Sequence, residues 1–156
     1  MKIFLHGLES SSQGAKATFL RRVFPDITVP DFKGSLAERM ASLRTILAGE
    51  KNIKIIGSSF GGLMATIFAM ENRETVARLV LLAPALNFPE FSSYAIQPVE
   101  IPTWLIIGSN DVVTPAERVL PRARKIFTTL HYHEVADDHL LAKTFRNIAW
   151  KSILGA

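Results

Sequence analysis

Short apolar runs alternate along the chain with longer segments of helical periodicity. The short runs predict strands at 3–5, 27–29, 53–56, 79–82, 103–107 and 131–135. Segments in which apolar residues recur every three or four positions predict helices over 16–24, 36–48, 60–71, 115–127 and 139–154. Strands that alternate with helices favour βαβ units, so we expect an α/β fold with a mostly parallel sheet of about six strands, flanked by helices.

Two helix starts carry their own signals. Ser35 and Glu38 form a capping-box pattern in front of the second helical segment, which ends at Gly49. Pro115 lies near the first turn of a later helix, where its missing N–H leaves no helical hydrogen bond unmade. The long irregular stretch 87–102 contains three prolines, and a stretch of this kind in a compact domain is more often functional than not.

Composition narrows the class of protein. The 156 residues are 48% hydrophobic and 21% charged, which predicts one globular domain over 1–156. The absence of cysteine excludes thiol catalysis, cysteine–zinc sites and disulfides. The net charge of +4 is dispersed, which favours a solvated surface over a nucleic-acid interface. The apolar stretch after Met1 is too short for a signal peptide, and no run reaches the ~18 residues of a membrane span. If Met1 is the true start, we expect a cytoplasmic protein.

The segment Gly57-Ser58-Ser59-Phe60-Gly61 has the pattern G-x-S-x-G between a predicted strand and a predicted helix. A nucleophile on so tight a turn needs small neighbours two positions away on either side. The spacing makes Ser59 the candidate nucleophile. The alternative, a Gly-Ser turn that only caps a helix, is less favoured in this context.

A serine nucleophile needs a base, and the base needs an orienting carboxylate. In the doubly wound hydrolase arrangement these follow in the order Ser, Asp, His, each after a later strand. Asp111 and His139 fit this order, with His139 at the start of the last predicted helix. Asp137 and Asp138 are rival acids, but they are better explained as residues that cap that helix or hold the loop that carries His139, called the histidine loop below.

The remaining histidines and the oxyanion donors complete the predicted site. His131 and His133 share one face of a strand, and a metal role for them is disfavoured; we predict no metal and no cofactor. We expect the oxyanion to be held by the backbone N–H groups of Phe60 and Leu8. His6 then orients the Leu8 loop and does not act as the base, although His6-Gly7 could also be a simple turn.

These motifs resemble the α/β-hydrolase superfamily across essentially the whole chain. The opening His6-Gly7-Leu8-Glu9-Ser10-Ser11-Ser12 resembles its small bacterial esterase and acyl-thioesterase-like branch. The resemblance implies hydrolysis of an ester or thioester through an acyl-serine intermediate, without a cofactor. Family members usually have two further strands at the start and a lid domain, and here only 87–102 could serve as a lid. Three aromatic residues of that stretch are candidates for a substrate-binding rim or, equally, for the core: Phe88, Phe91 and Tyr94.

We therefore expect a minimal hydrolase fold without a large lid, acting as a carboxylesterase on small or accessible acyl esters. A thioesterase with the same triad is the alternative, and a non-catalytic binding protein of the same fold is a less favoured one. The partner is a small-molecule ester or thioester. Neither nucleic acid nor a membrane span is expected, and the sequence leaves the oligomeric state open.

Overall fold

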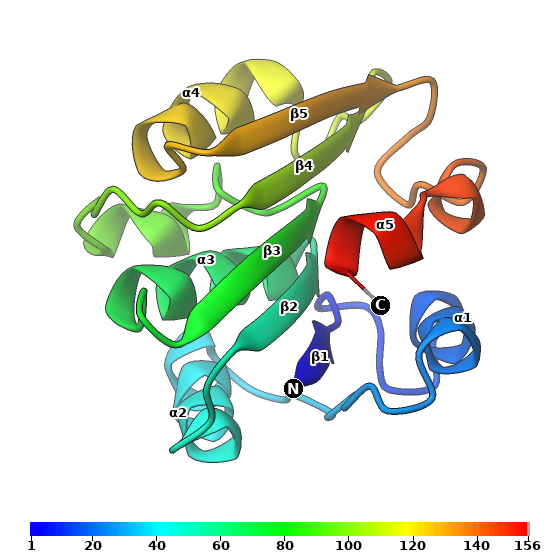
Figure 1. Cartoon of the computed structure of the whole chain (residues 1–156). Coiled ribbons are helices and arrows are strands. Elements are labelled where there is room, and N and C mark those ends of the chain that lie inside the picture. Colours follow the sequence, from blue (N-terminus) through cyan, green and yellow to red (C-terminus); the bar gives the residue numbers. More distant parts are fainter. Residues whose placement is uncertain (156) are drawn as a thin grey trace.

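The five strands of the sheet lie side by side in the same order as in the sequence (Figure 1). The computed structural model describes residues 1–155. Its strands are β1 (Lys2–Leu5), β2 (Ile53–Ser58), β3 (Val76–Leu82), β4 (Thr103–Gly108) and β5 (Leu130–Val135), and all neighbouring pairs are parallel. The predicted α/β class and parallel sheet are confirmed. Because the strands are parallel, their carboxyl ends meet at one edge, where the loops that follow them gather.

Helices cover both faces of this sheet (Figure 1). One face packs against α2 (Leu36–Leu47), α3 (Phe60–Glu71) and α4 (Ala116–Ile126), and the other against α1 (Ala15–Val23) and α5 (Trp150–Leu154). Side chains alternate between the faces, so Ile55 joins the core under α3 while Ile56 joins the core under α1. The predicted capping box is present at Ser35 and Glu38.

The segment expected to form a strand at 27–29 forms a single bridge instead. Thr28 pairs with Ile3, accepts a hydrogen bond from the N–H of Phe4 at 2.9 Å and donates one to the carbonyl of Lys2 at 2.9 Å. Pro30 has no N–H to donate, so the pairing cannot continue past it. The sheet therefore has five strands, and the bridge covers the outer edge of β1.

The long final helix expected over 139–154 is wrong. Residues 139–144 form a turn, followed by a 3-10 helix η2 (Phe145–Asn147) and the short α5. In a helix the N–H of Thr144 would bond the carbonyl of Leu140, but it donates to the carboxylate of Asp137 at 2.9 Å. The carbonyl of Leu140 accepts from Lys16 Nζ, and Leu141 has a φ of +54°. The loop thus wraps around Asp137 and cannot be helical.

The stretch 87–102 contains one short 3-10 helix, η1 (Pro89–Ser93), and no large lid is built from it. The side chain of Phe91 packs into the core beneath it. Within residues 1–155, no helix combines the length and the apolar character that crossing a bilayer requires.

Candidate active site

Ser59 occupies the turn between β2 and α3 in a conformation that few non-glycine residues adopt. Its φ is +54° and its ψ is −115°. Such a backbone persists only where the surroundings hold it. Here the N–H of Ser59 donates to the carbonyl of Leu82 at 2.9 Å, and its own carbonyl accepts from Gly62 and Ala85, each at 2.9 Å. The turn is therefore held rigidly, with the hydroxyl presented at the carboxyl edge of the sheet.

The glycines around Ser59 are required by close backbone approach. A Cβ on Gly57 would lie 2.5 Å from the carbonyl oxygen of Gly61, and one on Gly61 would collide with the carbonyl of Leu5. A Cβ on Gly7 would lie 3.4 Å from the Cβ of Ser59. The loop after β1 thus runs directly against the candidate nucleophile, which is the arrangement that the predicted oxyanion site requires.

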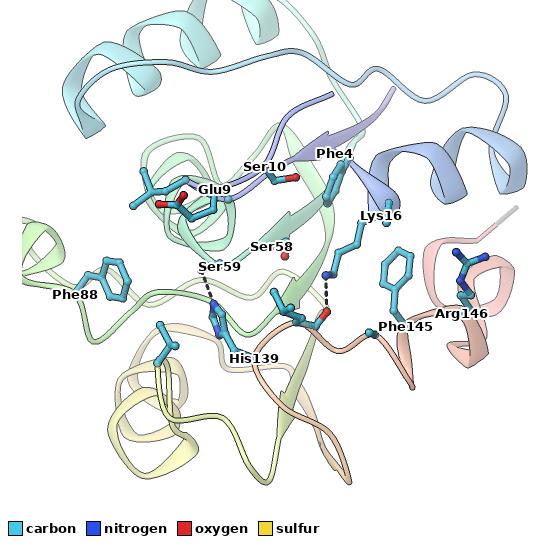
Figure 2. A pocket seen from close by; sticks show the side chains of 16 residues that line it. Phe4, Glu9, Ser10, Lys16, Ser58, Ser59, Phe88, His139, Phe145 and Arg146 are labelled. Atoms are coloured by element: carbon cyan, nitrogen blue, oxygen red, sulfur yellow. Dashed lines mark hydrogen bonds between the residues drawn. The ribbon is translucent and has the colours of Figure 1, made fainter. Parts of the chain in front are cut away.

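The structure brings Ser59, His139 and Asp111 together, although they are far apart in the sequence. Ser59 Oγ lies 3.0 Å from His139 Nε2 (Figure 2), and His139 Nδ1 lies 2.8 Å from Asp111 Oδ2. Asp111 follows β4 and is buried, whereas the His139 side chain is 19% exposed. With Nδ1–H donated to the carboxylate, Nε2 is left as an acceptor for the serine proton.

Thr114 belongs to this network, and the sequence reasoning missed it. Its buried hydroxyl lies 2.8 Å from Asp111 Oδ2 and 3.1 Å from His139 Nδ1. The N–H groups of Thr114 and Val113 both donate to Asp111 Oδ1, at 2.8 and 2.9 Å. Burial opposes ionisation of Asp111, but the hydrogen bonds from Thr114 and His139 outweigh it and lower the pKa of the carboxyl. The signal was available, because an Asp with a Thr three residues later, before a proline, is typical of a side-chain-capped turn.

Asp137 and Asp138 do not contact the His139 ring in the described hydrogen bonds. Asp137 is buried and accepts from the backbone N–H of Asp138 at 2.8 Å, from the backbone N–H of Lys143 at 3.0 Å, and from both the N–H and the hydroxyl of Thr144. Asp138 is exposed and accepts from the N–H of Leu140. Asp137 is thus the residue that shapes the histidine loop, which was one of its two predicted roles.

The Asp137→Asn variant is expected to lose less stability on acidification than the wild type. Burial raises the pKa of this carboxyl, but the hydrogen bonds from the loop outweigh burial and lower it. At about pH 4 and below, the unfolded carboxyl takes up a proton that the folded one still refuses, so its stabilising effect is lost as the pH falls. The free energy of unfolding in urea, measured at intervals from pH 7 to pH 3, checks this. Parallel curves for variant and wild type would contradict it.

His6 orients the loop that carries Leu8. The His6 ring is buried, its Nε2 accepts from the N–H of Phe32 at 3.0 Å, and its Nδ1 lies 2.7 Å from the carbonyl oxygen of Gly7. An Nε2 that accepts requires the proton on Nδ1, so His6 donates to the Gly7 carbonyl. This bond fixes the peptide between Gly7 and Leu8. Phe60, in the first turn of α3, has an N–H without a partner inside the helix.

A cavity of about 620 Å³ opens over Ser59 and His139. Its walls come from the loop after β1, the start of α1, the histidine loop and Phe88 (Figure 2). Three large apolar side chains on its lining are unusually exposed: Leu8 at 45%, Val113 at 45% and Leu140 at 65%. Its mouth is therefore apolar and open.

The three candidates for a substrate rim divide between cavity and core. Phe88 lines the cavity, and its ring lies 6.3 Å from that of Phe60. Phe91 is buried in the core under α3, and Tyr94 packs against the same core. Neither Phe91 nor Tyr94 lines the cavity, so the rim prediction is corrected for these two. Aromatic residues in an irregular stretch satisfy either role equally, and only the packing separates them.

The two histidines of β5 lie away from this cavity. His131 stacks on Trp104 with ring centroids 4.6 Å apart, and both His131 and His133 are exposed at the sheet edge. Among residues 1–155, no group of three or more His, Asp or Glu side chains is placed to hold a metal ion.

A model of the uncharacterised protein family UPF0227 matches residues 1–105, about two thirds of the chain. The chain belongs to this family. The matched region of this UPF0227 member includes the loop after β1, the Ser59 turn and β3, but neither Asp111 nor His139. A comparison with curated protein sequences finds no match.

This UPF0227 member has the same fold as solved structures of α/β-hydrolases. The α/β-hydrolase domain-containing protein 10 from mouse is 18% identical, with a TM-score of 0.80 over 97% of this chain and 87% of that one. Est1E from Butyrivibrio proteoclasticus with bound ferulic acid is 13% identical, with a TM-score of 0.79 over 94% and 84%. A monoacylglycerol lipase from Paleococcus ferrophilus is 14% identical, with a TM-score of 0.75 over 98% and 93%.

Proposed function

We propose that this protein is a serine hydrolase that cleaves small or accessible acyl esters as a carboxylesterase. The observation that carries the proposal is the continuous chain of contacts from Ser59 Oγ through His139 to Asp111, at 3.0 and 2.8 Å. The strained turn at Ser59 supports it, because backbone strain of this kind is found at functional sites. The esterase and lipase among the similar structures support the same class of reaction.

In the proposed reaction, Ser59 Oγ attacks the ester carbonyl while His139 Nε2 takes its proton. Asp111 holds the imidazole in the required tautomer and stabilises the cation that forms. His139 then gives the proton to the alcohol oxygen as the ester bond breaks, which leaves an acyl group on Ser59. Water repeats the sequence, so one ester and one water yield one acid and one alcohol.

The negative oxygen that develops in each step needs donors. We assign this role to the backbone N–H groups of Leu8 and Phe60, on opposite sides of Ser59 in the sequence. His6 positions the first through the Gly7 carbonyl, and α3 positions the second. Loss of one such donor lowers the rate on the order of 10²–10³-fold.

The apolar mouth formed by Leu8, Val113 and Leu140 suits an uncharged acyl or alcohol portion of modest size. The same catalytic groups would serve an oxygen or a sulfur leaving group. A thioester is therefore the alternative substrate, and the comparison of matched esters and thioesters separates the two.

Labelling with a fluorophosphonate probe tests the proposal directly. We expect the folded wild type to react and the adduct to map to Ser59. Ser59→Ala is expected to lose the adduct, while Ser58→Ala, the matched change one residue away, is expected to keep it at Ser59. Mass spectrometry of the digested adduct identifies the residue. Folded wild-type protein that neither labels nor hydrolyses any ester would leave the non-catalytic binding protein as the explanation.

A further inference from the structure

The lining of the cavity over Ser59 differs between the two sides of the Ser59–His139 pair, and each side is called an arm below. Figure 2 shows Lys16, Phe145 and Arg146 on one side of the Ser59–His139 pair, and Phe88 and Glu9 on the other. The first arm thus carries two cations against an aromatic wall. The fold places both cations on this lining, because α1 packs beside η2 through the rings of Phe19 and Phe145, whose centroids are 5.2 Å apart.

Lys16 is held in the cavity wall without an acidic partner. Its Nζ donates to the carbonyl of Leu140 at 2.5 Å and lies 5.5 Å from the centre of the Phe145 ring. The Leu140 carbonyl takes only one of the three ammonium donors. No carboxylate in residues 1–155 lies within ion-pair distance of Lys16 or Arg146.

Asp137 and Asp138 do not neutralise Lys16. Asp137 and Asp138 attract it at a distance, yet burial is the larger effect and lowers the pKa of the Lys16 ammonium. The Asp137 carboxylate is already occupied by the backbone and hydroxyl of its own loop. A partly buried cation without a counter-ion is energetically costly, and an anion brought by a ligand would offset that cost.

We propose that this arm binds an anionic group of the substrate, a carboxylate or a phosphate, through Lys16 and Arg146. The inference rests on the proposed hydrolase function and deepens it. The preferred ester then has an apolar part at the mouth of the cavity and a negative charge at the end that reaches α1. Arg146 is exposed and lines both this cavity and a neighbouring hollow, with its guanidinium 5.5 Å from the centre of the Phe19 ring. Lys16 contacts the anion on the inner side.

Matched pairs of esters test this preference for charge. For charge on the acyl part, 4-nitrophenyl hydrogen adipate is compared with 4-nitrophenyl hexanoate. For charge on the alcohol part, the hexanoate esters of 4-hydroxybutyrate and of 3-hydroxypropyl phosphate are compared with pentyl hexanoate. We expect at least one charged ester to exceed its neutral counterpart in kcat/KM by about tenfold, mainly through a lower KM, because hydrogen bonds between charged groups are worth this much. The carboxylate and phosphate esters show which anion is preferred.

Variants and salt assign the preference to these two side chains. Lys16→Gln and Arg146→Gln are each expected to reduce the ratio of charged to neutral kcat/KM several-fold. The ratio divides out any general effect of Lys16→Gln on the histidine loop. Arg22→Gln, which removes an exposed cation of the same helix outside the cavity lining, is expected to leave the ratio unchanged. Salt near 1 M, where the Debye length is ~3 Å, is expected to diminish the wild-type preference.

The outcomes separate this inference from the proposed function. Equal kcat/KM for charged and neutral esters, with Ser59 labelled and the neutral esters hydrolysed, would overturn the anion site and leave the hydrolase standing. A preference that survives in both Lys16→Gln and Arg146→Gln would overturn it too. Absence of both labelling and hydrolysis would instead count against the proposed function.

Discussion

Ser59→Ala is expected to lower kcat by on the order of 10⁴-fold or more, because the proposed mechanism has no other nucleophile. The variant keeps the Cβ and the backbone hydrogen bonds of the turn, so its free energy of unfolding should stay close to that of the wild type. Ester hydrolysis at saturating substrate, with urea unfolding of the same preparation, measures both quantities. Activity within tenfold of the wild type would contradict the role of Ser59.

Ser59→Gly is a second test of position 59, because it removes the hydroxyl and relieves the backbone strain together. Glycine adopts a φ of +54° without steric cost, so this variant is expected to be as inactive as Ser59→Ala and more stable by about 1 kcal/mol. A serine kept at a position where glycine is more stable would be explained by its hydroxyl chemistry. A less stable Ser59→Gly would show instead that the turn is not strained.

Asp111→Asn is expected to lower kcat by on the order of 10⁴-fold while the protein stays folded. An asparagine amide oxygen can still accept from the N–H groups of Val113 and Thr114. Its NH₂ cannot accept the Nδ1 proton of His139, so the imidazole loses the tautomer that leaves Nε2 free to take the serine proton. The pH dependence of kcat/KM for matched esters, together with circular dichroism, checks the result.

Asp138→Asn is the control for Asp111→Asn. It removes a neighbouring charge from an exposed residue that bonds only to its own loop. We expect its kcat to lie within a few-fold of the wild type. A large loss in Asp138→Asn with little loss in Asp111→Asn would reverse the assignment of the acid.

Local patterns predicted the elements and the order of the reactive residues. The alternation of buried strand runs and amphipathic segments depends on side-chain periodicity, which does not require knowledge of distant contacts. Gly57 and Gly61 predicted the tight turn at Ser59, because a turn of that geometry has no space for a side chain at either position. The elements and the turn depend on residues only a few positions away, so they can be predicted from the sequence alone.

Local patterns failed where contacts between residues far apart in the sequence decide the structure. The helix expected from His139 does not form, because the Asp137 carboxylate binds the N–H of Thr144 and the Lys16 ammonium binds the carbonyl of Leu140. Lys16 is far from Leu140 in the sequence. The pairing at 27–29 is limited to one bridge by Pro30, which is a local cause. Phe91 and Tyr94 pack in the core, whereas Phe88 lines the cavity. These three aromatic residues are similarly hydrophobic, so packing decided which of them lies in the core and which lines the cavity.

The residue pattern is enough to predict an α/β fold, a strained serine turn, and a histidine and an aspartate placed after later strands. Tertiary packing is what brings Ser59, His139 and Asp111 into contact, adds Thr114 to them, and places Lys16 and Arg146 on the lining of the same cavity. The difference arises because local backbone preferences are set by adjacent residues. Hydrogen-bond distances and uncompensated charges depend on which loops the parallel sheet brings to one edge.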